Sequence, residues 1–114
     1  LPVDHQLCSL ETGPDLVGSM HSACFEQYVV DSAVTIVWTA IPHRTEWRYA
    51  TLSPKLIALD AGHACQNLYL ACAAVGAGTC AVAAYDQKQM DALLKVDGED
   101  EFTIYLAPVG KIPA

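Results

Sequence analysis

The chain has 114 residues, of which 53% are hydrophobic and 17% charged. This composition predicts one domain, residues 1–114, with a modest core. Thirteen acidic residues against six basic ones give a formal net charge of −7, which opposes attraction to nucleic acid and to anionic membranes. We therefore expect neither as a partner.

A short helix and a buried strand are the first predicted elements. The segment 12–15 is typical of a turn, and Asp15 is suited to cap a helix over residues 16–24. Residues 34–41 form an almost continuous apolar, β-branched run that ends at Pro42, which predicts a buried strand. The next segment, residues 43–49, is polar and aromatic without a clear period.

A long helix is predicted over residues 54–75, with Ser53 as its N-cap and Pro54 as its first residue. Asp60, His63 and Asn67 share one narrow arc of this helix. The opposite side carries Ala58, Gly62, Cys65, Tyr69 and Cys72. A polar stripe on a buried helix needs hydrogen-bond partners, so we expect a subunit interface or a missing segment of the domain to supply them.

Glycines 76 and 78 follow this helix, so they predict a helix end and not a dinucleotide-binding loop, in which glycines precede the helix. The remaining predicted elements are an extended segment at 79–84, a helix at 87–95 capped by Asp86, a turn at 97–98 and a strand at 102–109. Alternating helices and strands predict a layered α+β domain.

The uncharged run at residues 61–85 is long enough to be weighed against a membrane span. Its early polar residues and its glycines favour a buried helix followed by a strand. No secretory signal is visible at the start of the chain, so a cytoplasmic protein is expected. Five cysteines without a C-x-x-C pair favour reduced thiols over disulfides or a zinc site.

Catalytic motifs are few. The sequence contains no nucleophile elbow, no H-E-x-x-H and no phosphate loop. Asp60 and His63 could together bind a metal, but a structural hydrogen bond is the favoured interpretation. We therefore predict no metal site and no catalytic side chain.

A basic and aromatic cluster follows the predicted strand and comprises Arg44, Trp47, Arg48 and Tyr49. It could stack on a planar ring or bind an anion. Alternatively, it is a loop whose aromatic side chains complete the core. The sequence leaves both open.

Four blocks together resemble one family. Residues 60–70 carry a D-A-G-H-x-x-Q-N-L-x-L motif, residues 44–49 an R-x-x-W-R-Y segment, and residues 83–86 a variant of G-x-F-D with Ala83 in place of glycine. Residues 97–101 with 108–111 form the fourth block. In this order the blocks resemble the nitroreductase-like flavoproteins, most specifically the SagB-type dehydrogenase branch.

The resemblance implies an FMN-dependent oxidoreductase with a layered α/β/α sandwich fold, in which two subunits enclose two flavins. Hydride would pass between NAD(P)H, the flavin and a small-molecule substrate, and because the cofactor carries this chemistry, no catalytic side chain is required. By position, the implied FMN-binding residues are Ala81, Val82, Ala83 and Ala84 at the N5 and O4 edge of the ring, and Gly110 and Lys111 toward the phosphate.

The resemblance covers the C-terminal half of the family domain. The Arg-and-Ser motif that grips the FMN phosphate in the other half has no counterpart in this sequence. We therefore expect a partial domain that works as a homodimer or with a partner chain supplying the missing half. The alternative is a flavin-free half-domain that serves as a dimerising structural or binding module.

Overall fold

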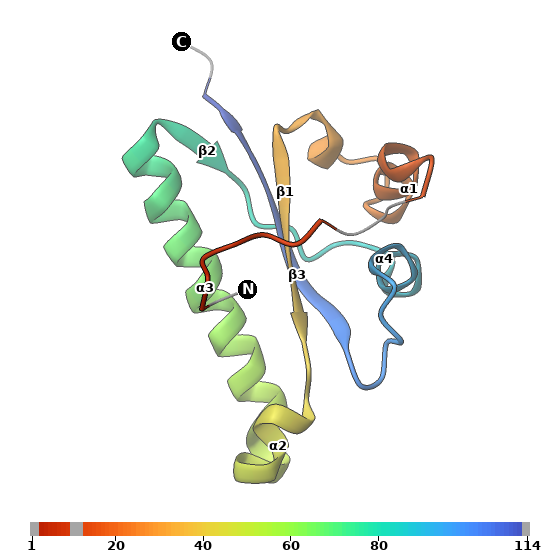
Figure 1. Cartoon of the computed structure of the whole chain (residues 1–114), viewed down its shortest axis with the longest axis vertical. Helices are drawn as coiled ribbons and strands as arrows, with labels where there is room; N and C mark the ends of the chain where they lie inside the picture. The colour runs from red at the N-terminus through yellow and green to blue at the C-terminus, as the bar shows by residue number, and fades with distance from the viewer. Residues whose placement is uncertain (1–2, 10–12, 113–114) are drawn as a thin grey trace.

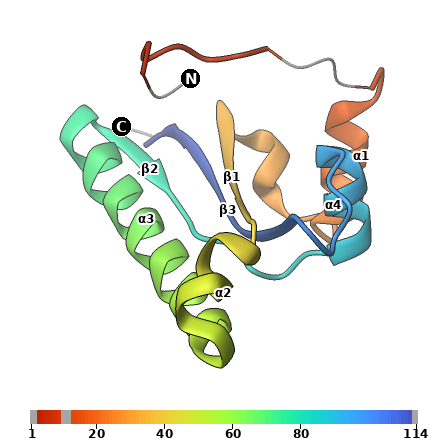
Figure 2. The same ribbon diagram turned by 60° about the horizontal axis from the view of Figure 1, so that its bottom comes forward.

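The computed structural model describes residues 3–9 and 13–112, so Thr12, in the predicted first turn, lies outside the described residues. The elements are α1 (Leu16–Ala23), η1 (Tyr28–Asp31), β1 (Val34–Ala40), α2 (His43–Tyr49), η2 (Ala50–Leu52), α3 (Ser53–Val75), β2 (Ala77–Thr79), α4 (Gln87–Leu94) and β3 (Phe102–Lys111). The long helix α3 lies on one side of the strands, with α1 and α4 on the other (Figures 1 and 2). This is the predicted layered α+β arrangement.

The three strands form an antiparallel sheet in the order β1-β3-β2, with β3 in the centre. Trp38 pairs with Tyr105 but Thr39 pairs with Thr103, so Ile104 is an extra residue on β3 and the pair contains a β-bulge. β3 continues two residues beyond its predicted end because Lys111 pairs with Ala77 of β2.

Side-chain caps begin two of the helices as predicted. Asp15 accepts the N–H of Gly18 at 3.1 Å, and Asp86 accepts the N–H of Gln89 at 2.9 Å. The predicted cap of α3 is wrong. Ser53 is its first helical residue, fully buried, and its hydroxyl donates backward to the Ala50 carbonyl at 2.7 Å, because the preceding 3-10 turn η2 leads directly into the helix.

The segment 43–49, which has no clear hydrophobic period, is the helix α2. The Pro42 carbonyl accepts the N–H groups of Thr45 and Glu46, both at 2.9 Å, and thereby starts the helix. Its aromatic side chains do not complete the core of this chain: Trp47 is 77% and Tyr49 43% exposed. Figures 1 and 2 place α2 at the lower end of the molecule.

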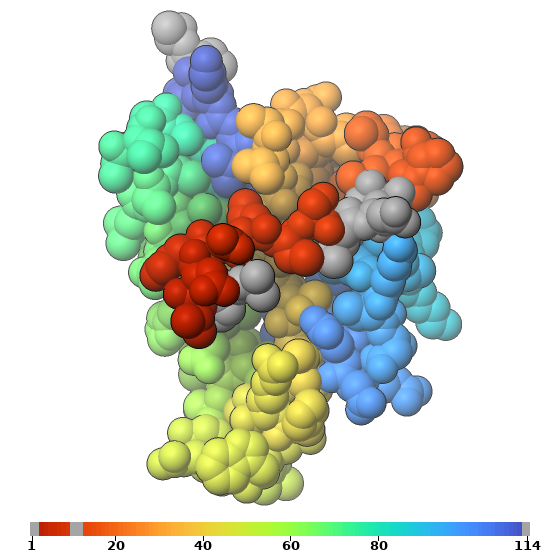
Figure 3. Space-filling model, in the orientation of Figure 1, coloured from red at the N-terminus to blue at the C-terminus, as the bar shows by residue number. Residues whose placement is uncertain are grey.

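The core lies between the sheet and the α1–α4 layer, and contains Ala23, Cys24, Val29, Val82, Met90 and Leu106. On the other layer, α3 buries Cys65 and Cys72. In front of the sheet, the amino-terminal segment crosses the surface of the molecule (Figure 3). Over the described ranges, the structure contains no helix with the length and hydropathy of a membrane span.

A buried carboxylate, Asp91, ties α4 to β3. It accepts the N–H of Thr103 at 2.7 Å, and the side-chain amide of Gln87 at 3.0 and 3.1 Å. Burial alone would raise the pKa of Asp91, but these hydrogen bonds outweigh it and lower the pKa below its ordinary value. The carboxylate is therefore charged in the folded protein and holds the start of β3.

We predict that Asp91→Ala lowers the free energy of unfolding by about 2–3 kcal/mol at pH 7, because it removes charge-assisted hydrogen bonds and leaves the Thr103 N–H buried without an acceptor. Since folding lowers the pKa of Asp91, its stabilisation is present above the unfolded pKa of about 3.9 and is lost as the pH falls through the folded value. Urea unfolding of both proteins at several pH values would show this. A difference that is independent of pH would contradict it, and Asp100→Ala, at an exposed position, is the control.

Ala50 has backbone angles that suit glycine, with φ 46° and ψ −120°. Such a conformation costs a non-glycine residue about 1–3 kcal/mol, whereas the extra flexibility of an unfolded glycine costs about 0.4–1 kcal/mol. We therefore expect Ala50→Gly to stabilise the chain by about 1 kcal/mol, measured as a higher urea midpoint with an unchanged slope. The same exchange within α3, Ala71→Gly, should destabilise by about 1 kcal/mol. Equal effects would exclude strain at Ala50.

Candidate functional site

The residues that follow β2, Cys80–Ala84, form an extended segment that we call the crossing segment. In its middle, Val82 donates its N–H to the Leu106 carbonyl at 2.8 Å and accepts the Leu106 N–H at 3.2 Å. The crossing segment therefore continues the pairing with β3 beyond the end of β2, along the same edge of β3.

Side chains from two other elements hold the ends of this segment. The Tyr69 hydroxyl, on α3, accepts the N–H of Ala81 at 2.8 Å. The side-chain amide of Gln27 donates to the Ala84 carbonyl, also at 2.8 Å. At its start, the Tyr28 hydroxyl donates to the Cys80 thiol at 3.1 Å. The backbone is thus fixed from both layers of the fold.

The four residues that were predicted to border a flavin ring fall into two pairs, according to whether their N–H groups are hydrogen-bonded within the chain. The N–H groups of Ala81 and Val82 are already engaged. Those of Ala83 and Ala84 have no hydrogen-bond acceptor within the described ranges, and both residues are exposed. Two consecutive backbone N–H groups therefore lack an acceptor in the described part of the chain.

The orientation of the Ala83 N–H follows from the peptide bond that it shares with Val82. In a planar trans peptide the C=O and the N–H point in opposite directions, and the described residues contain no cis peptide. Because the Val82 carbonyl faces Leu106 of β3, the Ala83 N–H points away from β3. Ala83 does not have a positive φ, so its place in a family glycine position causes no backbone strain.

The other predicted residues, Gly110 and Lys111, lie at the far end of β3, paired with Gly78 and Ala77. With Cys80 they line a cavity of about 350 Å³. Among its described lining residues, Lys111 is the one cation and Asp31 the one anion. Lys111 is five residues from Leu106, which is about 17 Å at the rise of an extended strand. Cys80 lies between the cavity at Lys111 and the bridge of Val82 with Leu106, on the same edge of β3.

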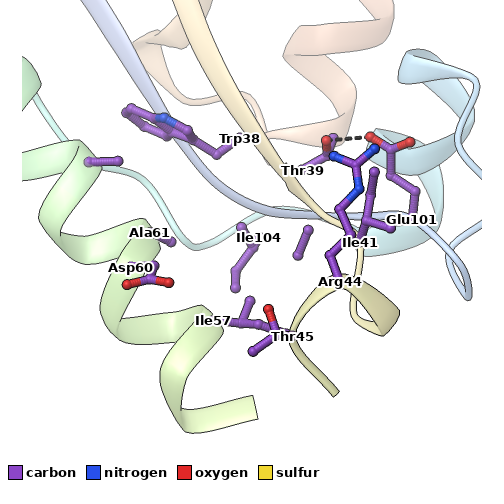
Figure 4. A pocket seen from close by; sticks show the side chains of 12 residues that line it. Trp38, Thr39, Ile41, Arg44, Thr45, Ile57, Asp60, Ala61, Glu101 and Ile104 are labelled. Carbon is purple, nitrogen blue, oxygen red and sulfur yellow. Dashed lines mark hydrogen bonds between the residues drawn. The ribbon is translucent and has the colours of Figure 1, made fainter. Parts of the chain in front are cut away.

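A larger cavity, of about 470 Å³, lies between β1, α2 and α3 and contains none of the predicted cofactor-binding residues. Figure 4 shows Arg44 entering it beside the hydrogen-bonded pair Thr39 and Glu101, with Asp60 on the α3 wall. Of the basic and aromatic cluster, Arg44 thus lines this cavity, whereas Trp47, Arg48 and Tyr49 do not. Nearby, the Arg48 guanidinium lies 5.6 Å from the Tyr49 ring centroid.

The favoured interpretation of Asp60 and His63, a structural hydrogen bond, is wrong. Both side chains are exposed on α3, and no hydrogen bond joins them. Across the described part of the chain, His, Cys, Asp and Glu side chains nowhere gather in threes to hold a metal ion. A spacing of three residues places side chains on one helix face, but solvent competes for both when that face is exposed.

Thiol environments differ sharply in this region. Cys80 is exposed, and its hydrogen bond with Tyr28 raises the pKa of that phenol. Burial raises the pKa of the Cys24 and Cys65 thiols. Cys80 is therefore the accessible thiol at the crossing segment.

Sequence reasoning missed Gln27, Tyr28 and Tyr69 as residues of this site. Tyr69 occupies a variable position of the D-A-G-H-x-x-Q-N-L-x-L motif, and the two others belong to no motif. Gln27 and Ala84 are 57 residues apart, so a local pattern could not have paired them. A tyrosine on the small-residue side of the long helix was the one available signal.

The sequence profile of the Nitroreductase family matches residues 7–111. The chain belongs to the nitroreductase family. A nitroreductase-like protein of Methanocaldococcus jannaschii is 26% identical over 90 residues, which cover 79% of this chain and 44% of that protein. This chain therefore spans less than half the length of that relative.

Solved structures agree with the family assignment. A nitroreductase-like protein of Anabaena variabilis superposes with a TM-score of 0.78 at 28% identity, over 83% of this chain and 20% of that one. A protein of Staphylococcus epidermidis described as an NAD(P)H:FMN oxidoreductase gives a TM-score of 0.66 at 11% identity, over 93% of this chain and 66% of that one. The second similarity shows the nitroreductase fold alone.

We predict that two of the five thiols react rapidly with a thiol reagent in the native chain, namely Cys8 and Cys80, because Cys24, Cys65 and Cys72 are buried. All five should react in denaturant. Mass spectrometry of peptides after a short alkylation pulse would identify the sites. A third thiol that is modified as fast as Cys80 under native conditions would contradict the burial described above.

Proposed function

We propose that this chain provides the ring-binding half of an FMN-dependent oxidoreductase of the SagB-type branch of the nitroreductase family. Hydride would pass between NAD(P)H and a small-molecule acceptor, or from a substrate to the flavin. The observation that carries the proposal is the pair of exposed N–H donors at Ala83 and Ala84, on a backbone fixed from both sides.

The residues present fit an FMN ring at the crossing segment. A flavin presents acceptors at N5 and O4, and the Ala83 N–H, which points away from β3, is a donor with no acceptor in the described residues; the Ala84 N–H is a second donor without an acceptor there. Alanine side chains are small enough to let a planar ring approach the backbone. FMN, when bound, supplies hydride chemistry at N5, whereas the chain orients the ring and favours negative charge on this edge through its N–H groups.

The phosphate side is less complete. Lys111 offers one cation and Asp31 lies in the same cavity, so further phosphate contacts must come from another chain or another part of the protein. The exposed face of α3 suits such an assembly, because it presents Leu59 and Leu70, 47% and 61% exposed. We propose a homodimer, or a complex with a chain that supplies the missing half of the domain.

The second candidate is a flavin-free half-domain that acts as a dimerising structural or binding module. This candidate is supported by the lack of further cations at the phosphate side, where Lys111 is the one cation among the described lining residues. Each charge-assisted contact that is missing removes about 1.5–3 kcal/mol of binding energy. Every 1.4 kcal/mol corresponds to a tenfold change in affinity. The two candidates therefore differ in a measurable quantity, the affinity for FMN.

The test is an FMN titration of the purified chain, followed by gel filtration with absorbance detection. We expect flavin to elute with the protein at the volume of a dimer, and Cys80 but not Cys8 to become protected from alkylation. Lys111→Ala should weaken FMN binding by about 10–100-fold, which is the loss of one charge-assisted contact. Lys88→Ala, on the exposed side of α4, should leave it unchanged.

Two results would go against the proposal. A colourless chain, with Cys80 equally reactive with and without FMN, favours the flavin-free module. Equal losses from Lys111→Ala and Lys88→Ala would instead indicate a general effect of charge, and would remove Lys111 from the site. With flavin retained, oxidation of NADH and NADPH can be assayed directly.

A further inference from the structure

We propose that Tyr69 and Gln27 are positioning residues, which hold the crossing segment so that the Ala83 N–H, which points away from β3, faces a bound ring. The inference rests on the proposed function and adds to it residues outside the ring-binding backbone. It follows from the hydrogen bonds at the two ends of the segment.

Tyr69 controls the first end. It lies on α3, a helix of 23 residues, and its hydroxyl accepts the Ala81 N–H at 2.8 Å. Without that hydroxyl, Ala81 would have a donor with no protein acceptor, and the peptide between Cys80 and Ala81 could rotate. The bridge at Val82 would then be the next fixed point.

Gln27 controls the second end. Its side-chain amide nitrogen donates to two carbonyls, those of Cys24 and Ala84, each at 2.8 Å. The same amide therefore connects the end of α1 to the end of the crossing segment. Beside this bond, the Asp86 N–H, two residues after the segment, donates to the Ala23 carbonyl at 2.7 Å, so α1 is joined both to the end of the segment and to the chain that follows it.

The turn that carries Gln27 is itself unusual. Phe25 and Glu26, which precede it, both have positive φ values, 53° and 58°. Two consecutive left-handed non-glycine residues are unfavourable. They place Gln27 where its amide reaches the Ala84 carbonyl, so the contacts that follow the turn stabilise an otherwise costly conformation.

Three fixed points along five residues leave little freedom between them. The Val82 bridge sets the Ala83 N–H away from β3, and the Gln27 bond fixes the carbonyl of Ala84. Hydrogen-bond donors serve a bound group well only when they are held to within about 0.5 Å and 10–20°. Tyr69 and Gln27 supply that precision from outside the site.

The experiment combines amide hydrogen exchange of the flavin-free chain with FMN titration. Tyr69→Phe should accelerate exchange at Ala81 and Val82, whose N–H groups are hydrogen-bonded in this segment, raise the dissociation constant for FMN by about tenfold and shift the absorption band of the bound flavin. Gln27→Glu places a carboxylate against two carbonyls; it should weaken FMN binding similarly and accelerate exchange at Asp86, whose N–H donates to the Ala23 carbonyl beside this contact. Tyr105→Phe is the matched control, because no hydrogen bond of the Tyr105 hydroxyl is seen in the described residues, and it should change none of these quantities.

The possible outcomes separate this inference from the function on which it rests. If wild type binds FMN and Tyr69→Phe binds it equally well with the same absorption band, the positioning role is overturned and the proposed function stands. If exchange responds but wild type binds no FMN, the proposed function fails and the positioning role fails with it. Equal exchange in Tyr69→Phe and Tyr105→Phe overturns the inference directly.

Discussion

Pairing along both edges of β3 is the constraint on which the rest of this structure depends. On one edge β3 pairs with the whole of β1, and on the other with β2 and then with Val82 of the crossing segment. Its start is held to α4 by Asp91. Because β3 is the last element in the chain, every one of these pairings joins residues distant in sequence. The sheet can therefore form only when the end of the chain takes its place.

The candidate site is a direct consequence of this pairing. A backbone hydrogen-bonded on one edge directs its alternate N–H and C=O groups to the other edge. The pairing of Val82 with Leu106 uses the inward groups and leaves the Ala83 N–H outward. Small side chains then keep the outward edge accessible. A run of alanines, which looks uninformative in the sequence, is thus suited to recognition by the backbone alone.

Local patterns predicted much of the fold. Apolar β-branched residues marked β1, and acidic N-caps marked α1 and α4, because these signals act within a few residues. The resemblance also pointed to Ala81–Ala84. The sequence could not show which of those N–H groups remain available, since that depends on Leu106 and Tyr69, which are distant in the chain.

The errors have physical reasons too. α2 is seven residues long, too short for a clear hydrophobic period, and it buries none of its own residues, so periodicity could not reveal it. Ser53 has the residue type of an N-cap, but η2 provides the preceding turn and converts its hydroxyl into a donor to Ala50. Asp60 and His63 were expected to bond because a spacing of three residues places a histidine beside a carboxylate on one helix face. In this chain their face is exposed.

On the proposed function, that exposed face would connect assembly with cofactor binding. On the proposed function, this chain holds the ring edge of FMN, and most of the phosphate contacts belong to the missing part of the domain. A ligand that contacts two parts stabilises their association by the free energy of its own binding. Flavin and the partner would therefore bind cooperatively, because each completes the site for the other. Leu59 and Leu70 on α3 would supply apolar contact between the parts, and the crossing segment would supply specificity for the ring. On the proposed function this chain would be one side of a shared site, whose backbone is held by Tyr69, Gln27 and Leu106.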